Sequence, residues 1–123
     1  MKGYVVDIEK LTLANNYFRQ VLFTAKNRQL VLMALQPGEE IGREVHNGHD
    51  QFFRFESGTG KVIIDGEESI VKDGSAVVVP AGSQHNVINT SSEIMRLYTI
   101  YSPPEHMDNT VHKTKAEAMA SHH

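Results

Sequence analysis

The apolar residues of this chain gather in short runs that are rich in β-branched, aromatic and long aliphatic side chains. Glycine, proline and aspartate residues separate the runs, as turns between strands require. Many short strands at this spacing, with no long helical pattern among them, predict an all-β fold, either a sandwich or a small antiparallel barrel. The runs cover residues 18–25, 29–36, 50–57, 60–66, 68–74, 75–80 and 94–102.

Three further segments complete the predicted organisation. Asp65 and Gly66 lie between two of the runs and predict a two-residue hairpin turn, because that turn needs residues that accept positive φ. Residues 103–113, PPEHMDNTVHK, are expected to form a polar loop. Residues 114–120, TKAEAMA, are the one stretch with a helical composition, so a short C-terminal helix is predicted.

The composition limits the classes of function. The length of 123 residues suits one domain, expected to span residues 1–123 with strands in 1–28 and the core in 29–102. Lys and Arg total 12 against 15 Asp and Glu, which gives no electrostatic case for binding nucleic acid. The N-terminus lacks the apolar run of a signal peptide and no stretch reaches the length of a membrane span, so we expect a cytoplasmic protein.

Histidine is the chemically informative residue type. The chain has no cysteine, so disulfides and thiol catalysis are excluded and any metal must be held by histidine, carboxylate or amide groups. The last two of the seven histidines stand at the C-terminus and carry no weight in the argument. The seven are His46, His49, His85, His106, His112, His122 and His123.

Two spaced motifs contain histidines. The stretch GSAVVVPAGSQHNVIN has the form G-x5-P-x-G-x2-H-x3-N, which runs from Gly74 to Asn89 and places His85 just after a turn. This motif resembles the second sequence motif of the cupin superfamily. Upstream, Gly38 begins a stretch with the spacing of the first cupin motif, usually written G-x5-H-x-H-x3-4-E-x6-G. Two identities differ, because Glu44 stands where the family usually has histidine and Gln51 where it has glutamate.

The resemblance covers about residues 29 to 102 and implies a double-stranded β-helix jelly roll with a metal site at one end. Glu44 and His46 are two apart on a strand, so they point to the same side. The resemblance implies that Glu44, His46, Gln51 and His85 converge there on one divalent transition metal ion. The formal charge of this set equals that of the usual three histidines and one glutamate. Such mixed nitrogen and oxygen ligands suit Fe, Mn, Ni or Zn, and Gln51 either ligates, holds a water or binds substrate.

Other residues compete for these roles. His49 and Asp50 offer an alternative ligand pair, although Gly48 marks a turn that favours a position at the rim for His49. Tyr98 and Tyr101 have opposite parity, so at most one of them lines the interior.

A second group of residues bears on the walls and mouth of the barrel. His106 and His112 are expected to be solvated loop residues or part of a lid. Phe53 and Phe55 share the parity of Gln51 and should face inward as core residues or as the apolar wall of a pocket. The remaining candidates are three arginines that could bind phosphate near the motif strands: Arg43, Arg54 and Arg96.

The function expected from the resemblance is a metal-dependent enzyme that acts on a small oxygen-rich metabolite, with dioxygenase, isomerase or lyase chemistry. The alternatives are a non-catalytic module that binds a small molecule and a structural protein with an empty barrel. A sugar-phosphate isomerase would need a basic cluster at the mouth, and the outward parity expected for Arg54 weakens that reading. The resemblance also implies a homodimer, in which residues 4–13, YVVDIEKLTL, could supply an exchanged edge strand.

Overall fold

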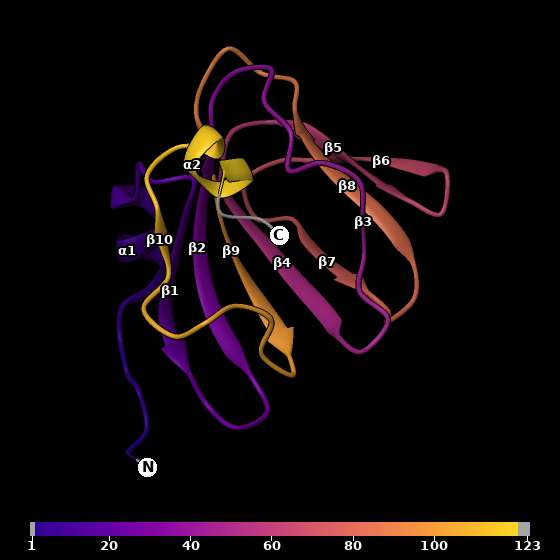
Figure 1. Cartoon of the computed structure of the whole chain (residues 1–123). Coiled ribbons are helices and arrows are strands. Elements are labelled where there is room, and N and C mark those ends of the chain that lie inside the picture. The colour runs from indigo at the N-terminus through magenta and orange to yellow at the C-terminus, as the bar shows by residue number, and fades with distance from the viewer. Residues whose placement is uncertain (1, 121–123) are drawn as a thin grey trace.

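The computed structural model describes residues 2–120, so the terminal His122 and His123 lie outside the described part. Two antiparallel sheets face each other across an apolar interior (Figure 1). The larger sheet has the strand order β10-β1-β2-β9-β4-β7 and the smaller one β3-β8-β5-β6. The predicted all-β jelly roll is therefore confirmed, as two facing sheets. The strands are β1 (Arg19–Thr24), β2 (Gln29–Leu35), β3 (Glu44–Val45), β4 (Asp50–Ser57), β5 (Gly60–Ile64), β6 (Glu67–Val71), β7 (Ala76–Val79), β8 (Gln84–Asn89), β9 (Met95–Ser102) and β10 (Val111–His112).

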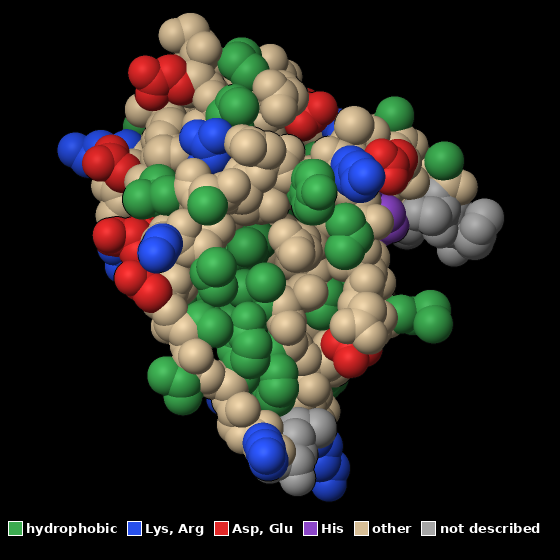
Figure 2. Space-filling model, turned by 90° about the vertical axis from the view of Figure 1, so that its left-hand side faces the viewer, with side chains coloured by type: hydrophobic (Ala, Val, Ile, Leu, Met, Phe, Trp, Pro, Cys, Tyr) green, Lys and Arg blue, Asp and Glu red, His purple; other side chains and the backbone are tan. Residues whose placement is uncertain are grey.

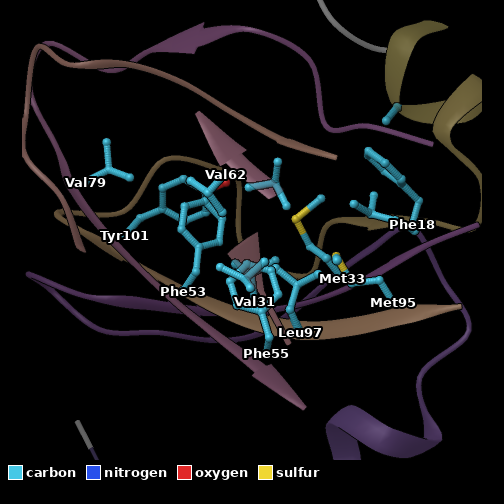
Figure 3. Packing of buried hydrophobic residues seen from close by; sticks show 14 of the residues in the cluster. Phe18, Val31, Met33, Phe53, Phe55, Val62, Val79, Met95, Leu97 and Tyr101 are labelled. Atoms are coloured by element: carbon cyan, nitrogen blue, oxygen red, sulfur yellow. The ribbon is translucent and has the colours of Figure 1, made fainter. Parts of the chain in front are cut away.

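Alternation of side chains along the strands builds the core. In β4 and β9 every second residue is buried, and Phe53, Phe55 and Leu97 are fully enclosed, as parity predicted for the two phenylalanines. Figure 3 shows these rings packed against Met33 and Met95 between the sheets. The predicted hairpin at Asp65 joins β5 to β6, and both of its central residues have positive φ.

The N-terminal segment corrects one prediction. Residues 8–14 form a helix, α1 (Ile8–Ala14), where an exchanged edge strand was expected. Asp7 caps this helix by accepting a hydrogen bond from the Lys10 amide at 3.1 Å. Thr12 is buried on the helix face that meets the large sheet, so helical spacing outweighs the β-rich composition of the segment.

The outer face of the large sheet carries apolar side chains beside α1. Figure 2 shows them gathered on the side of the molecule where α1 and β1 lie. Leu11 of α1 and Leu22 and Leu32 of the sheet line a shallow hollow there, together with Tyr17. Arg96 donates hydrogen bonds to Asn15 and Asn16 at the end of α1, so it holds the helix and does not reach a barrel mouth.

The C-terminal segment returns to the body of the protein. The predicted polar loop contains the short strand β10, which pairs with the start of β1, and the predicted helix is α2 (Lys115–Ala120). Ala118 of α2 packs with Phe18 in the apolar core. Within residues 2–120, no helix is long and apolar enough to cross a membrane.

Asn89, the last residue of the second motif, has a structural role. It is fully buried, and its amide nitrogen donates to the carbonyl oxygens of Leu35 at 3.0 Å and Glu93 at 2.7 Å. Its Oδ1 accepts from both the backbone amide and the hydroxyl of Ser91. One side chain thus ties the end of β2 to the turn between β8 and β9.

We expect Asn89→Ala to lower the free energy of unfolding by about 2–4 kcal/mol, because buried partners would lose their hydrogen bonds. Asn27→Ala, in an exposed turn, should change it by less than about 0.5 kcal/mol. Urea denaturation of both variants measures the difference. Equal stability of the two variants would contradict this role of Asn89.

Candidate metal centre

His85 reaches the interior because of how β8 begins. The turn at Pro80–Gly82 is held from the opposite side, since Gly82 donates its amide to the carbonyl of His46 at 2.9 Å and Ala81 donates to Asp50 Oδ1 at 2.9 Å. His85 then lies opposite Glu44 in the pairing of β8 with β3 and is 3% exposed. The two motifs therefore meet directly. Asp50, the alternative carboxylate ligand, instead holds this turn.

Each of the two ring nitrogens of His85 lies close to an oxygen atom. Nδ1 lies 3.2 Å from the Ser83 carbonyl oxygen, and Nε2 lies 3.1 Å from Gln51 Oε1. Gln51 is buried, and its amide nitrogen donates to Thr99 Oγ1 at 2.9 Å, which directs Oε1 toward His85. A neutral ring that donates from Nδ1 to Ser83 presents an Nε2 lone pair beside the lone pairs of Gln51. In that tautomer the two atoms could ligate one cation, whereas a proton on Nε2 would make the same contact a hydrogen bond to Gln51.

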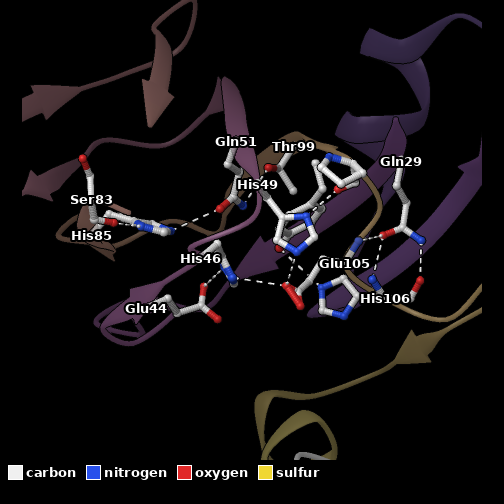
Figure 4. A network of polar contacts seen from close by, with 12 residues as sticks. Gln29, Glu44, His46, His49, Gln51, Ser83, His85, Thr99, Glu105 and His106 are labelled. Carbon is white, nitrogen blue, oxygen red and sulfur yellow. Dashed lines mark hydrogen bonds and ion pairs between the residues drawn. The ribbon is translucent and has the colours of Figure 1, made fainter. Parts of the chain in front are cut away.

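His46 presents a second ring nitrogen to the same space. Its Nε2 is buried and has no hydrogen-bond partner among residues 2–120, and Glu44 Oε1 lies 3.7 Å away. The ligand atoms of Glu44, His46 and His85 all lie within 4.8 Å of one another. Donors about 2.0–2.2 Å from one ion and adjacent in its coordination shell lie about 3.0–3.6 Å apart, so the side chains would have to move closer together to ligate it. Figure 4 shows Glu44 of β3, His46 just after it and His85 of β8 close together, with Gln51 of β4 beside His85.

Glu105 holds the other side of the His46 ring. Its Oε2 lies 3.2 Å from His46 Nδ1 and 3.4 Å from His49 Nε2. A carboxylate that accepts the Nδ1 proton leaves the lone pair of Nε2 for a ligand contact, as in many metal sites. His49 Nδ1 is also 2.7 Å from the Pro103 carbonyl oxygen, so His49 lies at the rim as predicted.

Gln29 positions the loop that carries Glu105. Its fully buried side chain accepts from the backbone amides of Glu105 and His106 and donates to the His106 carbonyl at 2.7 Å. Neither Glu105 nor Gln29 was identified from the sequence, because both lie outside the motifs. The one sequence signal was that Gln29, a polar residue, has the same inward parity as Val31 and so falls on an otherwise apolar, buried face.

Charge within the site favours a cation. Burial acts to raise the pKa of Glu44, but the neighbouring His46 outweighs it, and the pKa is lowered. Glu44 and then Glu105 raise the pKa of His46. The two carboxylates thus stabilise positive charge at the ring between them.

The remaining predicted residues form the walls. Tyr101 is buried while Tyr98 faces outward, and the Tyr101 ring lies 5.8 Å from that of His46. Burial raises the pKa of Tyr101, so its hydroxyl keeps its proton. The ring of Phe53 lies 6.2 Å from that of His85. A cavity of about 630 Å³ extends from Glu44 and His46 toward α2.

His106 gives the site a pH-dependent contribution to stability. Burial lowers the pKa of His106 to about 4, below its ordinary value of 6.5, and its Nε2 lies 3.4 Å from the Tyr101 hydroxyl. The unfolded chain binds more protons than the folded one between these values, so stability should fall as the pH falls from 6.5 to 4.

Urea denaturation of the metal-free protein at pH 7 and pH 5 checks this. His106→Gln should show a smaller loss of stability between the two pH values than the unmodified protein. Parallel losses in the two proteins would contradict the assignment to His106.

Comparisons with known proteins place these features in context. A family model described as Cupin domain matches residues 31–101. The chain is 48% identical to the uncharacterized protein YrkC of Bacillus subtilis, over 98% of this chain and 68% of that protein. BH2720 from Bacillus halodurans, a protein of known crystal structure, has 44% sequence identity with this chain and a TM-score of 0.96. The match covers 98% of this chain and 96% of that chain. TT1209 from Thermus thermophilus is 28% identical with a TM-score of 0.71, covering 80% of this chain and 96% of that one.

Proposed function

Because the chain belongs to the cupin domain family, we propose that it binds one divalent transition metal ion and acts as an enzyme on a small oxygen-rich metabolite. The observation that carries the proposal is the buried Nε2 of His46, which has no hydrogen-bond partner among the described residues and faces Glu44 and His85. Glu44 Oε1, at 3.7 Å, is too far for a hydrogen bond, so this buried nitrogen costs free energy that a bound cation would recover.

The donor set fits such an ion. Two imidazole nitrogens and one carboxylate oxygen form the minimum of a facial set that leaves other positions open, and Gln51 Oε1 adds a neutral oxygen next to His85. These donors suit Fe, Mn, Ni or Zn. A divalent ion held there would act as a Lewis acid toward the oxygen atoms of a small ligand.

The surrounding residues support an enzyme over a passive binding module. Glu105 and His49 lie within 3.4 Å of each other at the rim, where a carboxylate and an imidazole can accept or return a proton. The Tyr101 hydroxyl is a neutral donor fixed in the wall, and Phe53 helps to exclude water. A non-catalytic module would need ligand affinity alone and no group of this kind.

Metal content tests the proposal. Elemental analysis of protein purified without a metal-affinity column should find about one transition metal per chain. His46→Ala and His85→Ala should lose it, because each removes one of the three donors. His106→Gln is the matched control, since His106 lines the same region outside the donor set, and it should retain the metal. Full metal content in the His46 and His85 variants would contradict the site.

Glu105 should control how tightly the metal is held. We expect Glu105→Ala to weaken metal affinity by about 10–100-fold, since it removes the acceptor that orients His46. Glu105→Gln keeps an oxygen acceptor and should lose less affinity, while Glu68→Ala on the exposed edge of β6 should lose none. Competition with a chromophoric chelator measures all three. Unchanged affinity in Glu105→Ala would show that Glu105 does not orient the ring.

A further inference from the structure

A buried guanidinium lies beside the candidate metal centre. Arg19 begins β1, and it shares its inward parity with Val21, so its side chain points between the sheets. Only 8% of Arg19 is exposed. It lines the same cavity of about 630 Å³ as Glu44 and His46, a volume typical of sites for small molecules.

Among residues 2–120, no carboxylate lies within ion-pair distance of Arg19. Its Nη1 lies 3.2 Å from His112 Nδ1, and its Cζ lies 5.2 Å from the centre of the Phe18 ring. Burial, and then the charge of Arg19, lower the pKa of His112, so this partner is a neutral acceptor. Nε of Arg19 is buried without any hydrogen-bond partner among residues 2–120. A buried charge is costly unless it is paired, so this guanidinium is suited to receive an anion from outside the chain.

The charges around the cavity favour an anionic ligand. Arg43 and Lys115 line the same cavity, and neither forms an ion pair with a carboxylate among residues 2–120. The two carboxylates of the cavity lie against histidines, since Glu44 Oε1 is 3.7 Å from His46 Nε2 and Glu105 lies against His46 and His49. The buried Arg19, with Arg43 and Lys115 lining the same cavity, would attract a negatively charged ligand.

We propose that Arg19 binds the carboxylate of a small organic acid whose other end reaches the candidate metal centre. The part that concerns the metal rests on the proposed function; the part that concerns Arg19 does not. Because Nη1 already contacts His112, the Nε and Nη2 edge remains for the ligand. That edge is a planar pair of donors, and it matches the two oxygens of a carboxylate.

Calorimetric titration tests the proposal with malonate, succinate and glutarate as probes and inorganic phosphate in parallel. Each probe is added to the protein loaded with Mn²⁺ or Zn²⁺ and to the metal-free protein. At least one dicarboxylate should bind, and Arg19→Met should weaken its binding at least tenfold. Arg19→Lys keeps the charge without the fork and should give an intermediate loss. Arg28→Met, in the exposed turn between β1 and β2, is the matched control and should bind like the unmodified protein.

A second measurement does not depend on the folding of any variant. Nuclear magnetic resonance of the unmodified protein follows the Nε–H signal of Arg19 as the dicarboxylate is added. A shift that saturates with the calorimetric affinity supports direct contact.

The outcomes separate the two proposals. Binding that is equal in the unmodified protein and Arg19→Met, with an unmoved Nε–H signal, would overturn the role of Arg19 whatever the metal content. Phosphate binding as tight as that of every dicarboxylate would overturn the choice of a carboxylate. A protein that takes up no metal but still binds a dicarboxylate through Arg19 would contradict the proposed function and support the anion site.

Discussion

The antiparallel pairing of Glu44 with His85 is the contact on which the candidate metal centre depends. β3 is only two residues long, yet its register places the first motif directly against the second. A slip of one residue would turn Glu44 away from His85 and separate the donors. The register is held from outside the strand, by the Gly82 amide on the His46 carbonyl and by the Ala81 amide on Asp50. The proline and glycine of the second motif thus act on the site through the backbone, as does Asn89 at the other end of β8.

Polar groups buried beside the apolar core give the site its chemical character. Phe53 and Tyr101 enclose ring nitrogens that water would otherwise solvate, and in this environment each unpaired donor or acceptor has a large energetic effect. Glu105 contacts the outer nitrogen of His46, Nδ1, and Gln29 holds the loop that carries Glu105. The inner nitrogen of His46, Nε2, is left facing Glu44. The same cavity continues to Arg19, so the proposed cation site and the proposed anion site share one space.

Features that depend on local spacing could be predicted from the sequence. Parity along β4 predicted that Phe53 and Phe55 face inward. The resemblance to the cupin motifs implied that Glu44, His46, Gln51 and His85 converge, and these side chains do lie close together. Features that depend on distant contacts could not. Glu105 reaches His46 only because Gln29 holds its loop, and α1 forms where β-rich composition predicted a strand. Arg19 had a usable signal, a charged residue at the inward parity of Val21, but only the fold shows that it lies beside the donors.

The most direct test of this account is anomalous X-ray diffraction from crystals of protein purified without chelator or metal-affinity column. One anomalous peak is expected about 2.0–2.2 Å from the Nε2 atoms of His46 and His85 and from a carboxylate oxygen of Glu44. A structure without a peak at that position, even after soaking in Mn²⁺ or Zn²⁺, would contradict a metal centre there.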